Sequence, residues 1–213
     1  MIVFDFFSGT GSSTQAFKDA GHTVITFELD SSFEATENVD VMTLKAADLI
    51  ARYGQPDFIW ASPPCTAFSV ASMGHHWAQG GENPVPKTQA AKQSQELVAY
   101  TRDLIKELNP SKGWLIENPR GMLRKLPVVA ELPRQTVTYC TYGDSRMKPT
   151  DLWGGVAGWI PRTPCKNGQP CHEAAPRGSK TGTQGLKGAK ERSRVPHQLG
   201  EEILKAIETG ETE

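Results

Sequence analysis

The sequence lacks the features of several large protein classes. No apolar run approaches the roughly 20 residues that a membrane-spanning helix needs, so we expect no membrane segment. The apolar start Ile2–Phe4 has no basic stretch before it, so we expect no signal peptide. A Gly-Lys-Ser/Thr phosphate loop is also missing, which argues against hydrolysis of nucleoside triphosphates. The remaining expectation is a soluble, globular protein of the cytoplasm.

Cysteine is scarce, with four thiols among 213 residues. In a chain without a secretory signal, so few cysteines favour catalysis or metal binding over disulfides. Cys165, Cys171 and His172 lie in a Gly/Pro-rich stretch and could hold a zinc ion, with Cys140 as the fourth ligand. Their spacing is not that of a standard zinc finger, so buried free thiols are the alternative.

An excess of charge of one sign is also missing, since the net charge is −1, but the distribution is uneven. Residues 146–194 carry ten lysines and arginines against three acidic residues, a balance of +7 that leaves −8 for the rest of the chain. A basic segment on an acidic body favours a phosphate-binding surface and hence nucleic acid. A solvated basic loop is the alternative.

The pattern of apolar residues predicts strands that alternate with helices. Strands are expected over 1–7, 22–29, 41–44, 58–61, 114–116 and 136–142. Helices are expected over 12–20, 31–37, 46–53, 93–108 and 195–207. This alternation indicates an α/β fold with a parallel, doubly wound sheet.

Two stretches interrupt this rhythm. Residues 70–92 are rich in Gly, Asn, Gln, His and Pro, and residues 162–194 are rich in Gly, Pro, Lys and Arg. Long loops in a compact domain tend to be functional or disordered. Because the first stretch follows Cys65 closely, we interpret it as a mobile lid over a site.

The first expected strand runs into the turn Phe7-Ser8-Gly9-Thr10-Gly11, which precedes a helix. Two glycines at such a position let a ligand approach the backbone closely at a helix N-terminus. Glu28 ends the second strand, where an acidic residue can bind ribose hydroxyls. The third glycine of the dinucleotide pattern is missing, so the pair indicates a nucleoside-containing cofactor other than a nicotinamide.

Two further chemical groups follow strands. Cys65 comes after the strand 58–61 and the pair Pro63-Pro64, and Glu117 ends the strand 114–116. A thiolate and a carboxylic acid at neighbouring strand ends suit covalent attack on an electron-poor aromatic ring. A buried structural thiol and a surface acid are the alternatives.

In content and order these motifs resemble the cytosine-5 DNA methyltransferase family, which uses S-adenosylmethionine. The resemblance implies a Rossmann-like methyltransferase sheet with a very small target-recognition appendage. It places Phe7 against the adenine, Glu28 on the ribose and, as a weaker match, Asp48 near the adenine amine. The resemblance also assigns the turn that begins at Phe7 and the residue Pro63 to cofactor binding. The segment Arg194-Val195-Pro196 resembles the family's last motif, which folds back beside the cofactor.

The resemblance implies that Cys65 attacks carbon 6 of cytosine while Glu117 contacts nitrogen 3 and the exocyclic amine. In duplex DNA the target base must then be flipped into the pocket. The eighth motif departs from the family, because Arg146 stands in place of its glutamine and Lys148 in place of its first arginine. Either residue is a candidate to hold the base carbonyl.

The resemblance also sets the expected organisation. We expect a catalytic, cofactor-binding domain over 1–150, a small basic target-recognition region over 151–192 and a returning C-terminal helix over 193–213. A target-recognition region of this small size predicts a short or relaxed recognition sequence. The overall pattern resembles compact bacteriophage methylases, which implies a monomer in a bacterial or phage-infected cell and protection of DNA against restriction.

Three alternatives remain open from the sequence. The first is methylation of cytosine in RNA, and the second is transfer to an exocyclic amine. Cys65 and Glu117 weigh against amine transfer. The third is a non-catalytic module that binds nucleic acid or S-adenosylmethionine, which the altered eighth motif slightly favours.

Overall fold

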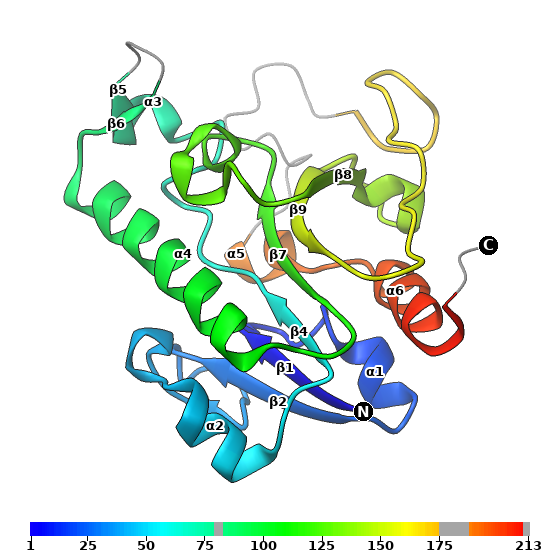
Figure 1. Ribbon diagram of the computed structural model, residues 1–213. Helices are drawn as coiled ribbons and strands as arrows, with labels where there is room; N and C mark the ends of the chain where they lie inside the picture. Colours follow the sequence, from blue (N-terminus) through cyan, green and yellow to red (C-terminus); the bar gives the residue numbers. More distant parts are fainter. Residues whose placement is uncertain (79–82, 175–187, 211–213) are drawn as a thin grey trace.

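A seven-stranded sheet forms the centre of the computed structural model, which describes residues 1–78, 83–174 and 188–210 (Figure 1). The strand order is β3-β2-β1-β4-β7-β9-β8. The strands are β1 (Ile2–Phe6), β2 (Thr23–Glu28), β3 (Glu37–Asn38), β4 (Phe58–Ala61), β7 (Trp114–Pro119), β8 (Arg134–Thr138) and β9 (Pro149–Gly155). The strands from β3 to β7 are parallel, and their carboxyl ends therefore share one edge of the sheet.

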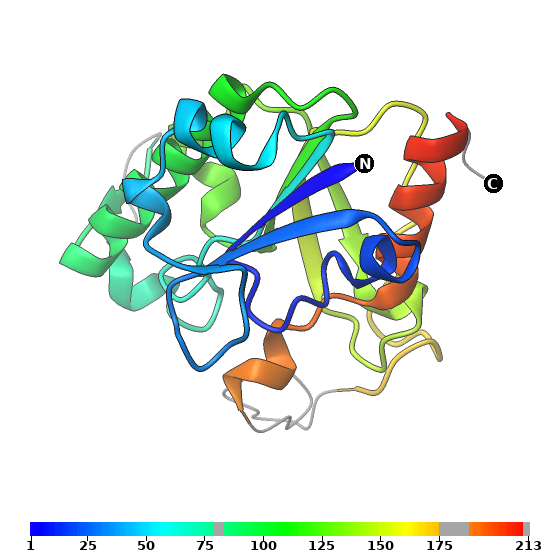
Figure 2. The same ribbon diagram turned by 90° about the horizontal axis from the view of Figure 1, so that it is seen from below.

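Helices cover both faces of this sheet (Figure 2). Helix α1 (Gln15–Asp19) packs with α6 (His197–Thr209) on one face, and α2 (Ala46–Tyr53) packs with α4 (Gln89–Leu108) on the other. Strands buried on both faces consist of continuous apolar residues, and all four residues of β4 are buried. Ile59 joins the core beneath α4 while Trp60 joins the core beneath α6, as the alternation of side chains along a strand requires.

The sheet differs from the expected one at its far edge. Strand β9 pairs antiparallel with both β7 and β8, and it extends to Gly155, beyond the expected domain boundary at residue 150. The link from β8 to β9 is short and holds only the 3₁₀ helix η4 (Tyr139–Tyr142), so the chain must reverse direction there. The expected strand over 136–142 accordingly ends at Thr138.

Two other local predictions were wrong. The segment expected as a strand over 41–44 contains the 3₁₀ helix η1 (Val41–Thr43), because the Asp40 carboxylate accepts a hydrogen bond from the Met42 amide at 3.0 Å. The helix expected over 31–37 is absent from that described stretch, where Thr36 instead binds Thr26 of β2 through its amide and hydroxyl groups.

The segment interpreted as a lid has its own structure where it is described. It contains α3 (Met73–His76), β5 (Trp77–Ala78) and β6 (Val85–Pro86), and residues 79–82 lie outside the described part. Trp77 is buried, lies 6.1 Å from Phe68 between ring centroids, and donates a hydrogen bond to the Ala67 carbonyl at 2.8 Å. The segment is thus anchored to the chain that follows Cys65.

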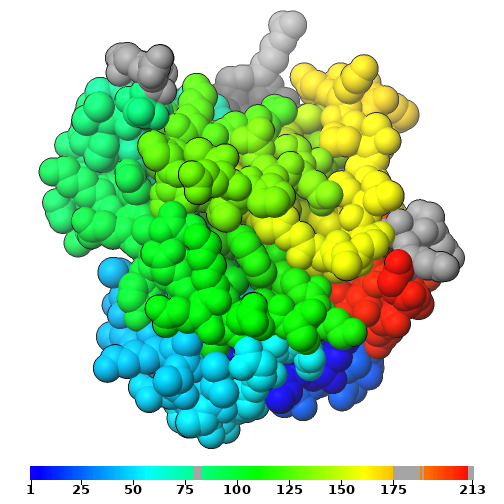
Figure 3. Space-filling view, in the orientation of Figure 1, coloured from blue at the N-terminus to red at the C-terminus, as the bar shows by residue number. Residues whose placement is uncertain are grey.

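The other elements complete the surface. Helices η2 (Leu123–Lys125) and η3 (Pro127–Val129) connect β7 to β8, and α5 (Ala189–Ser193) precedes α6. The chain that follows β9, yellow in Figure 3, lies at the surface beside α6. Within the described ranges, no helix combines the length and apolar character needed to cross a membrane.

Candidate active site

The carboxyl ends of β1, β4 and β7 border a cavity of about 800 Å³. The turn after β1, the residues after β4 and the end of β7 all contribute walls to it. The expected site residues that line it are Phe7, Ser8, Gly9, Thr10, Pro63, Cys65, Glu117 and Lys148. One continuous space therefore joins the expected cofactor turn to the expected nucleophile. This is the edge at which open α/β sheets bind ligands.

A tight turn forms the end of the cavity at which we expect the cofactor. Phe7, Gly9 and Gly11 have φ values of +60°, +49° and +70°, and the Gly11 amide donates to the Ser8 carbonyl at 2.7 Å. A left-handed φ favours glycine, so the conformation of Phe7 is strained. Ser8 lines the cavity, and its buried hydroxyl has no hydrogen-bond partner among the described residues. An unpaired buried hydroxyl is a natural contact for a bound polar ligand.

Glu28 connects this turn to the end of β2. Its carboxylate accepts hydrogen bonds from the Gly9 amide at 2.8 Å and from the Asp30 amide at 3.0 Å. The structure therefore brings Glu28 to the cofactor turn, although Glu28 and Gly11 are not among the residues that line the cavity. Asp48 lies exposed in the first turn of α2 and does not line the cavity.

The buried carboxyl group of Asp5 holds the chain that follows this turn. The Asp5 carboxylate in β1 accepts hydrogen bonds from the Ser13 hydroxyl at 2.8 Å and the Thr14 hydroxyl at 2.7 Å. Burial raises the pKa of Asp5 to about 6, against the favourable hydrogen bonds from Thr14 and Ser13. These bonds fix the chain between the glycine turn and α1.

The loop that carries Cys65 is held at both ends by the chain around the end of β7. The Asn118 side-chain amide donates to the Pro63 carbonyl at 2.8 Å, and the Met122 amide donates to the Phe68 carbonyl at 2.7 Å. Gly121 permits the second contact, because a Cβ there would lie 2.2 Å from the Phe68 oxygen. Between these two hydrogen bonds, the Cys65 carbonyl accepts a hydrogen bond from the Phe68 amide at 2.9 Å, which begins a helical turn.

Charges near Cys65 oppose one another. Burial, and then the nearby Glu117 carboxylate, raise the pKa of the Cys65 thiol, while the Lys148 cation lowers it. Glu117 is buried and accepts a hydrogen bond from the Tyr139 hydroxyl at 3.1 Å. The Lys148 ammonium lies 4.5 Å from the centroid of the Tyr139 ring, and burial lowers the pKa of Lys148. Tyr139 thus contacts both charged neighbours of the thiol.

The structure separates the two candidates of the eighth motif. Lys148 lines the cavity, with a strained φ of +28°. Arg146 is buried but does not line the cavity. Its guanidinium forms an ion pair with Asp144 and donates to the Glu191 and Arg192 carbonyls at 3.2 Å each. In this arrangement Lys148, and not Arg146, presents a positive charge to the cavity.

Some contributors to the site were not expected from the sequence. Tyr139 was assigned only to a strand, and nothing in the local pattern links it to Glu117. The segment before α6 also reaches the cavity through Arg192, Ser193 and Val195. The Val195 amide donates to the Ser12 hydroxyl at 3.0 Å, so the returning segment expected from the family's last motif does lie beside the cofactor turn.

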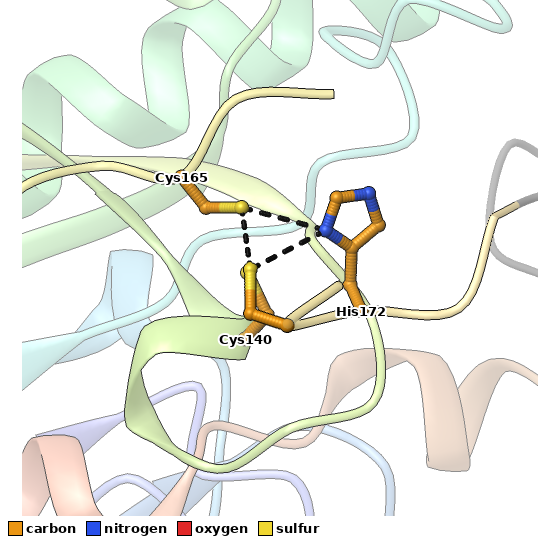
Figure 4. Close-up of side chains that lie close together, drawn as sticks. Cys140, Cys165 and His172 are labelled. Atoms are coloured by element: carbon orange, nitrogen blue, oxygen red, sulfur yellow. Dashed lines mark hydrogen bonds between the residues drawn. The ribbon is translucent and has the colours of Figure 1, made fainter. Parts of the chain in front are cut away.

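The four expected metal ligands also come together. One ligand atom from each of Cys140, Cys165, Cys171 and His172 can be chosen so that all four lie within 4.8 Å of one another. Cys140 belongs to η4, and the other three follow β9 (Figure 4). This cluster does not line the cavity.

Solved structures establish the class of the fold. A methyltransferase of Entamoeba histolytica, EhMeth, is 15% identical with a TM-score of 0.53, over 72% of this chain and 52% of that one. The Dnmt2 methyltransferase of S. pombe is 14% identical with a TM-score of 0.50, over 75% and 52%. This chain therefore spans about half the length of these structures. The chain shares its α/β fold with these methyltransferases, as expected from the sequence.

Sequence comparisons identify the family within this class. A family profile described as C-5 cytosine-specific DNA methylase matches residues 1–127. A probable DNA (cytosine-5)-methyltransferase of Frog virus 3 is 32% identical over 80% of this chain and 78% of its own length. The Type II methyltransferase M.AplI of Arthrospira platensis is 30% identical over 63% of this chain and 37% of its own. The chain belongs to the C-5 cytosine-specific DNA methylase family, which confirms the enzyme class expected from its motifs.

A substitution at Gly121 tests the two-ended attachment of the Cys65 loop. In Gly121→Ala the added Cβ must displace the Phe68 carbonyl, because 2.2 Å is far inside van der Waals contact. We expect a loss of unfolding free energy of about 1–3 kcal/mol, together with loss of methyl transfer. The control is Gly155→Ala, where a Cβ meets no atom within 4 Å. Denaturant titration and a methyl-transfer assay compare the two variants. Equal stability and equal activity of Gly121→Ala and Gly155→Ala would contradict this role.

A substitution at Lys148 tests the electrostatics of the thiol. The raised pKa of Cys65 means that the thiolate fraction grows as pH rises, so the rate of a single turnover should increase with pH. Lys148→Met removes the cation that favours the thiolate, and its rate profile should rise at higher pH than that of the wild type. If the loss of the cation raises the pKa of Cys65 by about one unit, the rate near pH 7 falls about tenfold.

The charge-retaining variant Lys148→Arg is the matched control and should keep the wild-type profile. Coincident pH profiles for Lys148→Met and the wild type would show that the ammonium does not tune Cys65. The measurement is the burst rate of methyl transfer across pH, with protein pre-saturated with cofactor.

Proposed function

We propose that the chain methylates carbon 5 of cytosine in DNA through a covalent adduct with Cys65, with S-adenosylmethionine as the methyl donor. The single observation that carries this proposal is the shared cavity. Cys65 and Glu117 line the same space as the turn from Phe7 to Thr10. A nucleophile, an acid and a nucleoside-binding turn around one cavity fit transfer between a bound cofactor and an extruded base.

The residues present fit S-adenosylmethionine. Phe7 offers an aromatic face for adenine, Glu28 lies against the turn where ribose hydroxyls would bind, and Ser8, whose buried hydroxyl is unpaired among the described residues, lines the cavity. When bound, the cofactor supplies an electrophilic methyl group. Pro63 and the glycine turn would form the walls around the cofactor. The exposed Asp48 would contact the cofactor only from the edge of the cavity.

The chemistry on cytosine follows from the charges near Cys65. The thiolate adds to ring carbon 6, and Glu117 contacts ring nitrogen 3 and the exocyclic amine, which stabilises the ring after addition. Carbon 5 is then nucleophilic and accepts the methyl group. Removal of the carbon-5 proton by a base and departure of the sulfur restore the aromatic ring. Lys148 favours the thiolate and is our candidate to hold the base carbonyl.

We assign the recognition of DNA to the basic segment of the chain. We place the target-recognition region within residues 151–192, although β9 shows that its first residues belong to the central sheet. Three of its cationic residues, Arg177, Lys180 and Lys187, lie outside the described residues. A flipped base, a short recognition sequence, a monomeric enzyme and action in the cytoplasm remain parts of this proposal.

A mechanism-based adduct tests the proposal. Duplex DNA that contains 5-fluorocytosine has no carbon-5 proton to lose, so the ring cannot release the sulfur once methylated. With methyl-labelled cofactor, we expect a labelled protein–DNA adduct that survives denaturing electrophoresis. It should disappear in Cys65→Ser and remain in Gly155→Ala, because Gly155 does not line the cavity and an added Cβ there meets no atom within 4 Å.

Three outcomes contradict the proposal. Adduct formation with RNA but not DNA would identify an RNA enzyme. Label on the exocyclic amine, without an adduct, would identify a different transfer reaction. Cofactor or DNA binding without any transfer would identify a non-catalytic module.

A role in protecting DNA gives a separate prediction. One relative is viral, and another is named as a Type II methyltransferase. DNA from cells that express the chain should resist nucleases that are blocked by 5-methylcytosine, and DNA from cells with Cys65→Ser should be cut. Bisulfite sequencing of the same DNA would give the sequence context. Equal cutting of both DNA samples, despite transfer in vitro, would argue against protection.

A further inference from the structure

The chain that follows β9 has little to hold it in place by packing. Over residues 160–174 it forms no helix or strand, and Cys165 is the one buried residue of this stretch. Ile160, the large apolar residue at its start, is 71% exposed. Ordering a backbone costs roughly 1–2 kcal/mol per residue, and this stretch buries almost no apolar surface to offset that cost. Its described conformation therefore needs another source of stability.

Three side chains of the stretch are of types that can bind a metal. Cys165, Cys171 and His172 meet Cys140 of η4, which precedes β9 in the sequence. Figure 4 shows Cys140, Cys165 and His172 close together. These four are three of the four cysteines of the chain and one of its five histidines. Chance exposure of polar groups does not explain their meeting, since Cys140 and Cys165 are both buried.

The distances suit a tetrahedral ion. Bonds of about 2.3 Å to sulfur and about 2.0–2.1 Å to nitrogen place two sulfurs roughly 3.8 Å apart and a sulfur and a nitrogen roughly 3.6 Å apart. The Cys140 and Cys171 sulfurs lie 3.7 Å apart. The His172 Nδ1 atom lies 3.4 Å from the Cys165 sulfur and 3.6 Å from the Cys171 sulfur. The Cys165 and Cys171 sulfurs, 2.6 Å apart, would have to separate by about 1 Å.

A disulfide accounts for less of this arrangement. A bond between Cys165 and Cys171 requires about 2.05 Å between the sulfurs, so their 2.6 Å separation would change less for a disulfide than for a metal ion. A disulfide would, however, leave Cys140 and His172 beside it without a function, whereas a metal ion would use all four residues. Three thiolates and an imidazole form the ligand set of a closed, structural zinc site, with no open position for catalysis.

We propose that Cys140, Cys165, Cys171 and His172 bind one structural zinc ion, which fastens the segment 160–174 to the wall of the active site. On binding, the three thiols release their protons to solvent, and the neutral imidazole coordinates through Nδ1. The site then carries a net charge of −1 within an otherwise basic segment.

Backbone contacts show which wall the ion would stabilise. The Cys165 amide donates to the Thr138 hydroxyl at 2.8 Å, and the Glu173 amide donates to the Ser145 carbonyl at 2.9 Å. The segment thus contacts the chain on both sides of η4. Tyr139, the neighbour of Cys140, holds Glu117 and lies under the Lys148 ammonium. An ion at Cys140 would therefore fix the part of the chain that places these two charges near Cys65.

Metal content tests the site independently of methyl transfer. The full chain, purified without chelators or metal-affinity resin, should contain about one zinc per molecule by inductively coupled plasma mass spectrometry. Cys165→Ser and His172→Ala should each lower this to a small fraction, since losing a ligand weakens a structural site by far more than the 10–100-fold typical of outer-sphere changes. Cys65→Ser, which removes the cysteine outside the cluster, should keep the full zinc content.

Replacement by cobalt gives the coordination sphere. A tetrahedral site with three thiolates should show intense visible bands and sulfur-to-cobalt charge transfer in the near ultraviolet, and both should weaken in Cys140→Ser. Chelation should also raise amide hydrogen exchange in 160–174 and η4, but not in α4. The proposal is overturned by metal-free protein that shows no cobalt bands on reconstitution, or by a Cys165–Cys171 disulfide in protein kept under reducing conditions. Neither result depends on whether the enzyme transfers a methyl group.

Discussion

The hydrogen bond from the Asn118 side-chain amide to the Pro63 carbonyl is the contact on which the site depends. β4 and β7 are neighbouring parallel strands, so their ends are close, but the sheet alone does not determine how the chain continues past them. The bond joins the two continuations directly at 2.8 Å, in a buried position. Since Asn118 follows Glu117 and Pro63 lies just before Cys65, one interaction sets the acid and the nucleophile against the same cavity.

The same region concentrates groups that are costly to bury. A thiol, a carboxyl group and an ammonium group line one cavity, and burial raises the pKa of Cys65 and lowers the pKa of Lys148, in each case against the charged form. Removing one partner of such a set leaves the others without compensation. The strained φ values of Phe7 and Lys148, which both line the cavity, add to this cost. Strain of this kind persists only where the surrounding structure enforces it, and it tends to collect at functional sites.

Much of this arrangement could be predicted from local sequence. β1, β4 and β7 are largely buried and each begins with an apolar run, and the glycines after β1 are required by positive φ angles. Once these strands are assigned as parallel, the meeting of Cys65 with Glu117 follows from the shared edge of the sheet.

The features that the sequence did not reveal depend on contacts that its patterns do not show. The direction of β9 depends on the short turn at η4, and Arg146 is held by Asp144 and by backbone carbonyls some 45 residues further along the chain. Trp77 anchors a stretch whose composition resembles that of a free loop, because one buried aromatic ring outweighs many polar neighbours. No periodicity or spacing carries this information.

The most direct measurement is a crystal structure of the enzyme trapped on duplex DNA that contains 5-fluorocytosine. The account predicts a flipped base bonded through carbon 6 to the Cys65 sulfur, with Glu117 at nitrogen 3, Lys148 at the carbonyl side and Arg146 still paired with Asp144. A base that lies outside this cavity, or a ring held there without a bond to Cys65, would contradict it.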